Sequence, residues 1–169
     1  MRSAKFYSFI AVQVIILFLL VGQYYLIDSY GETFKVYIKT PYEYDFENYR
    51  SDIYVEYGIT EITQGKWGIH DELTYNDQIY VLLETDNHGV YIVRDVADHK
   101  LDPYYDDQVA LKAFYSYEYL GKYHVNYPLP AEINKSYFDG IDRNEPMIAY
   151  FKRAPWGQFK LIGIENVGK

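Results

Sequence analysis

The pattern of apolar and polar positions begins with a long hydrophobic segment near the N-terminus. This segment, residues 6–27, contains no charged side chain. As an α-helix it would be about 33 Å long at roughly 1.5 Å per residue, enough to cross a hydrocarbon core of about 30 Å. Its apolar side chains occur on all sides, whereas those of a surface helix in a soluble protein form one stripe. The pattern therefore predicts a transmembrane helix over residues 6–27, in contact with the lipid bilayer.

The charges that flank this segment predict its orientation. Arg2 and Lys5 precede it, and the first charge after it is acidic. Basic residues next to a membrane span stay in the cytoplasm. We therefore expect residues 1–5 to be a cytoplasmic tail of a single-pass cell-membrane protein. Residues 28–169 would then form an extracytoplasmic domain.

A cleaved signal peptide is the alternative interpretation of the same segment. Ser29 and Gly31 place small residues at the −3 and −1 positions of a cleavage site. The apolar segment is longer than the usual signal-peptide core of roughly 7–15 residues. An uncleaved anchor is therefore favoured.

Beyond the anchor, apolar and polar residues alternate with a period of two, which is typical of β-strands. Two alternating segments around the polar turn 85–89, which contains Gly89, predict a β-hairpin. Residues 42–52 are polar and acidic and predict a long loop, whereas 128–140, with Pro130 near its start and Gly140 at its end, predicts a short helix. The alternating segments are 33–39, 53–59, 79–83, 90–96, 109–115, 123–125, 147–151 and the residues from 159 onward.

In the predicted helix, Ile133 and Tyr137 would face a sheet, because residues four apart share one face. The whole pattern predicts a mainly β protein. A transmembrane helix would be followed by one antiparallel β-sheet or partial-barrel domain with one short helix.

The amino-acid composition limits the classes of ligand that this domain can bind. All 24 acidic residues follow the anchor, against 14 basic ones, so the external part has a formal charge of −10. Such a surface repels phosphate backbones, and we expect no nucleic-acid binding. The chain has 22 Tyr. Most suit the half-buried surface of a sheet, and a face that stacks on a sugar or peptide is the alternative.

Known catalytic and metal-binding patterns are missing from the sequence. The absence of cysteine excludes disulfides, thiol catalysis and thiolate metal sites. The four histidines do not have metal-ligand spacing, and no serine lies in a Gly-x-Ser-x-Gly motif. We therefore predict no catalytic residue, no metal site and no cofactor.

One stretch resembles a family signature. Residues 49–59 read Tyr-Arg-Ser-Asp-Ile-Tyr-Val-Glu-Tyr-Gly-Ile and resemble the motif of the GDYXXLXY family of membrane-anchored bacterial proteins. That motif is Arg-Gly-Asp-Tyr, two free positions, Leu, one free position and Tyr. Arg50 and Asp52 match it with Ser51 in place of Gly, and Val55 and Tyr57 match Leu and Tyr if one residue is deleted. The resemblance implies an N-terminal membrane segment and a β-rich domain of unassigned activity.

Arg50 and Asp52 are the pair that we single out as a candidate site. A structural role, in which they close the acidic loop onto the strand at 53–59, is favoured over contact with a ligand. For the whole protein we expect a non-catalytic accessory or interaction module that docks on an integral membrane partner. The alternative is a cell-envelope sensor or glycan- or peptide-binding domain. A cleft with convergent Tyr and carboxylates would favour this alternative, and a flat apolar patch near the membrane would favour the accessory module.

Overall fold

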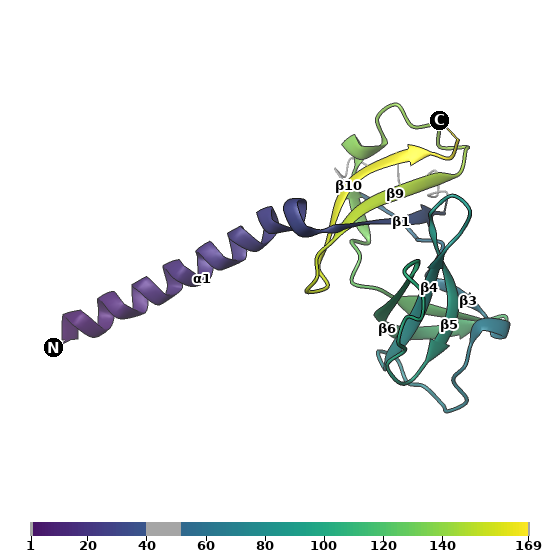
Figure 1. Ribbon diagram of the computed structural model, residues 1–169, viewed down its shortest axis with the longest axis horizontal. Coiled ribbons are helices and arrows are strands. Elements are labelled where there is room, and N and C mark those ends of the chain that lie inside the picture. Colours follow the sequence, from purple (N-terminus) through teal and green to yellow (C-terminus); the bar gives the residue numbers. More distant parts are fainter. Residues whose placement is uncertain (1, 40–51, 169) are drawn as a thin grey trace.

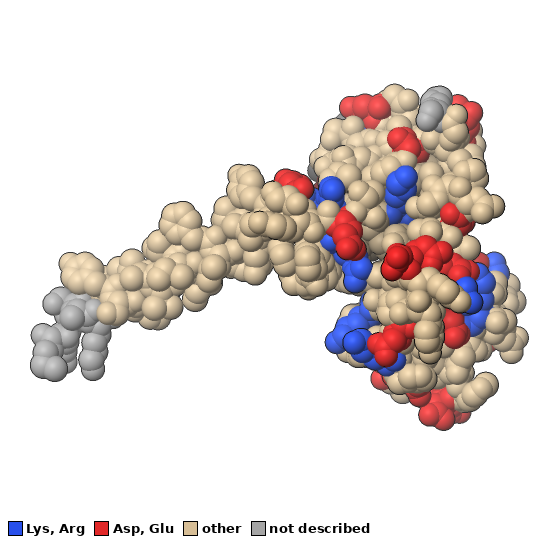
Figure 2. Space-filling model, in the orientation of Figure 1, with Lys and Arg blue, Asp and Glu red and all other residues tan. Residues whose placement is uncertain are grey.

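Figure 1 shows the computed structural model, which describes residues 2–39 and 52–168. Its first element, α1 (Arg2–Tyr30), projects from the β-rich remainder as one long arm. The segment Phe6–Tyr30 has a mean hydropathy of 2.2, and only 6% of its most apolar part is buried. Figure 2 shows charged side chains where α1 meets the domain, while the arm itself is uncharged on the visible face. This helix is long and apolar enough to cross a membrane.

The helix ends later than predicted and passes directly into the first strand. The backbone N–H of Gly31 still donates to the carbonyl of Ile27, at 2.8 Å, and β1 begins at the next residue, Glu32. Ile27 is buried, with 3% of its surface exposed. The last turns of α1 therefore belong to the same packed unit as the domain.

The rest of the described chain contains ten strands and two short 3-10 helices, joined by turns and loops. They are β1 (Glu32–Ile38), β2 (Asp52–Tyr54), β3 (Glu61–Thr63), η1 (Gln64–Lys66), β4 (Gln78–Thr85), β5 (Tyr91–Ala97), β6 (Gln108–Tyr119), β7 (Lys122–Asn126), β8 (Glu132–Asn134), η2 (Lys135–Phe138), β9 (Met147–Arg153) and β10 (Phe159–Asn166). The named strands pair in antiparallel fashion in the orders β1-β9-β10, β2-β8 and β3-β7-β6-β4-β5.

The five-stranded sheet nearly closes on itself. Trp67, which follows β3 and η1, forms a parallel bridge with Val96 on β5. The N–H of Gly68 donates to the carbonyl of Val96 at 3.0 Å. These two contacts join the segment after the edge strand β3 to the opposite edge strand, β5. The predicted mainly β fold with a partial barrel is confirmed.

The core lies where the three-stranded sheet meets this partial barrel. As the alternation predicts, Phe34, Val36 and Ile38 on β1 are all buried. The ring of Phe34 stacks on Tyr91 of β5, with centroids 4.7 Å apart, and contacts Phe159 of β10 at 5.1 Å. Apolar side chains therefore hold the two sheets together.

The predicted hairpin is confirmed as β4 and β5. Leu83 pairs with Val93, and Val81 pairs with Val96. In the turn, the Asp86 carboxylate accepts hydrogen bonds from the backbone N–H groups of His88 and Val90, at 2.8 and 3.0 Å. The local alternation and a turn-forming Asp are enough to determine this element.

The predicted strand at 53–59 is only partly correct. Its alternate apolar residues are all buried, but β2 ends at Tyr54. The N–H of Val55 still donates to Ala131, which continues the pairing of β2 with β8. The backbone then changes its partner, because Tyr57 bridges to Ile38 on β1 and the N–H of Gly58 donates to Tyr37. A segment that is shared between two neighbours cannot remain one straight strand.

The predicted helix at 128–140 is only partly correct, because helical structure is confined to residues 135–138. The segment forms β8, which pairs with β2, and then the single turn of η2. The Asn134 side chain accepts a hydrogen bond from the Ser136 N–H at 3.0 Å, which caps this short turn. Ile133 is buried as expected, but Tyr137 is 38% exposed and Phe138 is buried in its place. The helical part of this segment is therefore the 3-10 turn η2, and the domain has a second such turn in η1.

Candidate functional site

The candidate pair from the sequence is only half described. Arg50 and most of the predicted loop 42–52 lie outside the described residues. Asp52 is the first residue of β2, is exposed, and accepts a hydrogen bond from the Asn134 amide at 3.3 Å. This bond joins β2 to β8 and, because it is exposed, stabilises the fold little. A functional role for the pair Arg50 and Asp52 stays a prediction.

Val55 and Tyr57, the other two signature residues, are core residues. Each is 3% exposed. The Tyr57 hydroxyl donates to the Pro130 carbonyl at 2.5 Å, and burial raises the pKa of this hydroxyl above its ordinary range. Their role in the described structure is to pack the segment after β2 against the domain.

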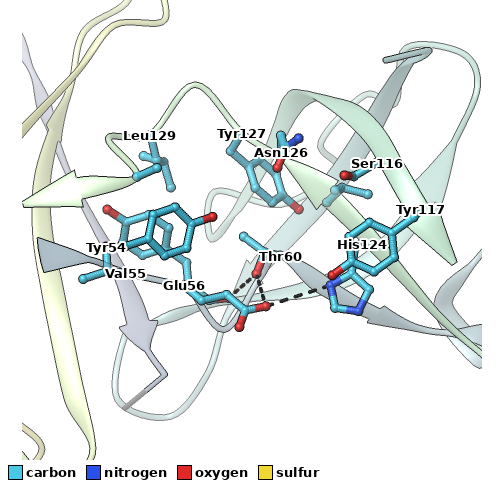
Figure 3. A pocket seen from close by; sticks show the side chains of 13 residues that line it. Tyr54, Val55, Glu56, Thr60, Ser116, Tyr117, His124, Asn126, Tyr127 and Leu129 are labelled. Carbon is cyan, nitrogen blue, oxygen red and sulfur yellow. Dashed lines mark hydrogen bonds and ion pairs between the residues drawn. The ribbon is translucent and has the colours of Figure 1, made fainter. Parts of the chain in front are cut away.

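Val55 and Tyr57 also contribute to the lining of a cleft. It has a volume of 270 Å³ and is formed by the segment around β2 together with β6, β7 and the chain after β7. Figure 3 shows Tyr54 and Leu129 at one end, Tyr117 and His124 at the other, and Glu56 between them. Its lining residues are Tyr54, Val55, Glu56, Tyr57, Thr60, Ser116, Tyr117, His124, Val125, Asn126, Tyr127, Leu129 and Ala131.

Exposed aromatic rings stand at both ends of the cleft. Tyr54 is 60% exposed and Tyr117 is 52% exposed. Tyr117 and His124 are cross-strand partners on β6 and β7. Their rings stack with centroids 4.3 Å apart and planes 15° from parallel. The stack fixes the orientation of the Tyr117 ring, so this end of the cleft presents a preorganised apolar surface.

The polar wall of the cleft is a network of polar and charged side chains centred on Glu56. Its Oε1 lies 3.1 Å from Lys39 Nζ, 3.4 Å from the donating Thr60 hydroxyl and 3.9 Å from His124 Nδ1. Lys39 also pairs with Glu61 on β3, at 3.1 Å. The carboxylate is thus held in place by groups from several elements, which suits it to accept a hydrogen bond from a ligand.

Glu61 continues this network away from the cleft. Lys122 Nζ lies 2.6 Å from its Oε1. The hydrogen bond from Lys122, aided by one from Lys39, lowers the pKa of Glu61 despite partial burial. Burial acts to lower the pKa of Lys39, but its hydrogen bonds to Glu61 and Glu56 raise it. These ion pairs join β3, β7 and the residue after β1.

The floor of the cleft is fixed by a buried tyrosine. The Tyr127 hydroxyl donates to the Ile59 carbonyl at 3.1 Å, and burial raises the pKa of this hydroxyl above its ordinary range. This bond ties the chain after β7 to the segment before β3. The cleft therefore has a rigid frame with exposed side chains at its rim.

The arrangement is suited to binding. Among the described residues, the cleft hydroxyls of Ser116 and Thr60 make no hydrogen bond with His124, and no group of three His, Asp or Glu side chains is placed to hold a metal ion. What the cleft offers is two exposed aromatic rings, an oriented carboxylate and the Asn126 amide.

Sequence reasoning missed the cleft residues Tyr54, Glu56, Tyr117 and His124. The sequence does contain a pattern for two of them: Tyr54 and Glu56 are the outward positions between the buried Ile53, Val55 and Tyr57. No local pattern shows that they meet residues more than 50 positions away on β6 and β7.

Comparison with models of protein families, with characterised proteins and with solved structures produced no match to this chain. Membership of the GDYXXLXY family therefore stays a prediction from residues 49–59. The function must be inferred from the geometry of the cleft and from α1.

Proposed function

We propose that this protein is a non-catalytic binding module held at a membrane by α1, and that it binds its ligand in the cleft between Tyr54 and Tyr117. The observation that carries this proposal is the convergence of two exposed tyrosine rings on one immobilised carboxylate, Glu56. Clefts with apolar faces and a few oriented polar groups are typical ligand sites.

The chemistry of the cleft favours one unit of a neutral carbohydrate. Aromatic rings supply flat surfaces for the apolar face of a sugar ring, and Glu56 and Asn126 can bond its hydroxyl groups. The acidic domain repels anionic ligands. Pockets that enclose a whole drug-sized ligand have roughly 300–1,000 Å³, whereas this cleft has 270 Å³. It accommodates one ring of an oligosaccharide whose other rings remain outside.

Alanine substitutions at the rim test this function. We expect Tyr54→Ala and Tyr117→Ala each to weaken binding of neutral hexose or N-acetylhexosamine oligosaccharides about tenfold, or ~1.4 kcal/mol. Titration calorimetry on full-length protein in lipid nanodiscs measures the affinity. Thermal unfolding of each variant should stay unchanged, since both side chains are exposed.

Tyr75→Ala is the matched control, because Tyr75 is 75% exposed and lies outside the cleft. It should bind like the wild type. Failure of every oligosaccharide to bind the wild type, or normal binding by both rim variants, would overturn the carbohydrate proposal. A protein that only docks on an integral membrane partner through α1 would give the first of these results.

The orientation of the chain is the second part of the proposal: the domain lies outside the cell membrane and residues 1–5 lie in the cytoplasm. Because the chain has no cysteine, single cysteines report topology without background labelling. We expect Tyr104→Cys, at a side chain that is 87% exposed, to react with a membrane-impermeant maleimide in intact cells. Ser3→Cys should react only after permeabilisation. The reverse pattern would overturn the orientation.

A further inference from the structure

The turn between β9 and β10 presents a tryptophan to the surface. Trp156 is 44% exposed. Its indole N–H donates to the Gln158 side chain at 2.9 Å, and the Ala154 N–H donates to the Gln158 carbonyl at 2.8 Å. Gly157 has a φ of +90°, which only glycine adopts readily. The turn is thus well defined and holds the indole in an exposed position.

This turn lies at the junction of the domain with α1. Lys160, at the start of β10, pairs with Asp28 at 2.7 Å, and its ammonium group lies 4.2 Å from the centre of the Tyr24 ring. On β9, Lys152 Nζ donates to the Gly31 carbonyl at 3.1 Å. Figure 1 shows the β9–β10 turn at the side of the domain from which α1 extends.

The junction is too tightly packed for the domain to swing freely. A Cβ atom on Gly31 would lie 2.4 Å from the Ile27 carbonyl oxygen and 3.1 Å from Lys152 Cβ. Together with the burial of Ile27, this close approach fixes the direction in which α1 leaves the domain. The position of Trp156 relative to the helix end is therefore determined.

The residue types at this junction, tyrosine, tryptophan and lysine, are those that are common at membrane interfaces. Tyr24, Tyr25 and Tyr30 near the end of α1 are 55%, 68% and 67% exposed. Tyrosine and tryptophan are enriched at the level of lipid headgroups because one end of each side chain is apolar and the other polar. Lysines at that level can reach the headgroups with their ammonium groups.

We infer that the Trp156 turn is a second membrane contact, inserted into the headgroup layer beside the end of α1. With it the domain touches the bilayer at two places, and its orientation on the lipid surface is fixed. This inference rests on α1 crossing the membrane and is independent of what the cleft binds.

The two tryptophans of the chain provide the test. Trp67 stacks on Tyr123, with ring centroids 4.0 Å apart, and follows β3, which Figure 1 shows on the far side of the domain from α1. Trp67→Phe leaves Trp156 as the sole indole, and Trp156→Phe leaves Trp67. Full-length variants are reconstituted into phosphatidylcholine vesicles with or without bromine on the acyl chains near the headgroup, and the vesicles are isolated by flotation.

We expect brominated lipid to reduce Trp156 emission about twofold, because an indole in the headgroup layer contacts the upper acyl chains. Trp67 emission should be unchanged. Trp67→Phe could disturb folding in a way that makes this variant unusable. The emission of Trp156 is then obtained by subtracting the emission of the Trp156→Phe variant from that of the wild type. Equal emission of Trp156 in both lipids would overturn the inference. A Trp156 that contacts another protein instead of lipid would give this result. Protein that fails to float with the vesicles would show that α1 is not an anchor, and the inference would fall with it.

Discussion

Phe151→Ala is expected to lower the free energy of unfolding by about 3–5 kcal/mol, the usual cost of removing a buried aromatic ring. Phe151 is fully buried in the middle of β9 and pairs with Phe34 on β1 and Leu161 on β10. Its ring contacts Tyr57 at 5.8 Å and Phe159 at 6.3 Å between centroids. Because these neighbours come from separate elements, they cannot all move in to fill the cavity.

Denaturant titration of the full chain in mild detergent, followed by circular dichroism in the β-strand region, measures this change. Ile162→Ala on β10 is the control: Ile162 is 44% exposed, and surface substitutions change stability by about 0.5 kcal/mol or less. Similar losses in the two variants would mean that the packing around Phe151 is not the source of the effect.

The parts of the fold that could be predicted from the sequence are those in which local pattern and tertiary contacts agree. The long apolar segment and the β4–β5 hairpin are of this kind, since each satisfies its backbone hydrogen bonds within itself or with its neighbour in sequence. The buried faces of β1 and β9 also follow from alternation. In each case, a period of two or an unbroken apolar run leaves one consistent structure.

The segment 128–140 shows where this agreement fails. Pro130 and Gly140 are compatible with a helix, but Ile133 is buried in an extended strand that pairs with β2. Tertiary pairing therefore outweighs a weak helical pattern over a few residues. The same competition divides the segment 53–59 between β8 and β1.

The candidate site required contacts that no local pattern contains. Tyr54 and Glu56 are visible as the polar side of an alternating segment, but Tyr117 and His124 become their neighbours only through the pairing of β6 with β7. That pairing shifts its register between Tyr115 and Tyr117. A one-residue shift changes which face a side chain occupies, so strict alternation along β6 could not place Tyr117 at the cleft.

Gly68→Ala is expected to lower the free energy of unfolding by about 2–4 kcal/mol, from steric overlap together with a lost hydrogen bond. A Cβ at this position would lie 2.5 Å from the Val96 carbonyl oxygen, which also accepts the Gly68 N–H. The clash is with backbone, so no side-chain rotation relieves it. Gly68 is not among the residues with positive φ, and close approach is therefore what requires glycine here.

The position of this clash determines which part of the sheet should open first in the Gly68→Ala variant. The Gly68–Val96 contact ties the chain after η1 to the edge strand β5, and Trp67 next to it stacks on Tyr123 of β7. Opening this contact exposes Trp67, so its emission in a Trp156→Phe background should shift to longer wavelength at denaturant concentrations below global unfolding. Gly65→Ala is the matched control, because a Cβ there meets nothing within 4 Å. It should leave stability unchanged or raise it by about 0.4–1 kcal/mol. Equal behaviour of the two glycine variants would mean that the contact with Val96 does not hold the sheet closed.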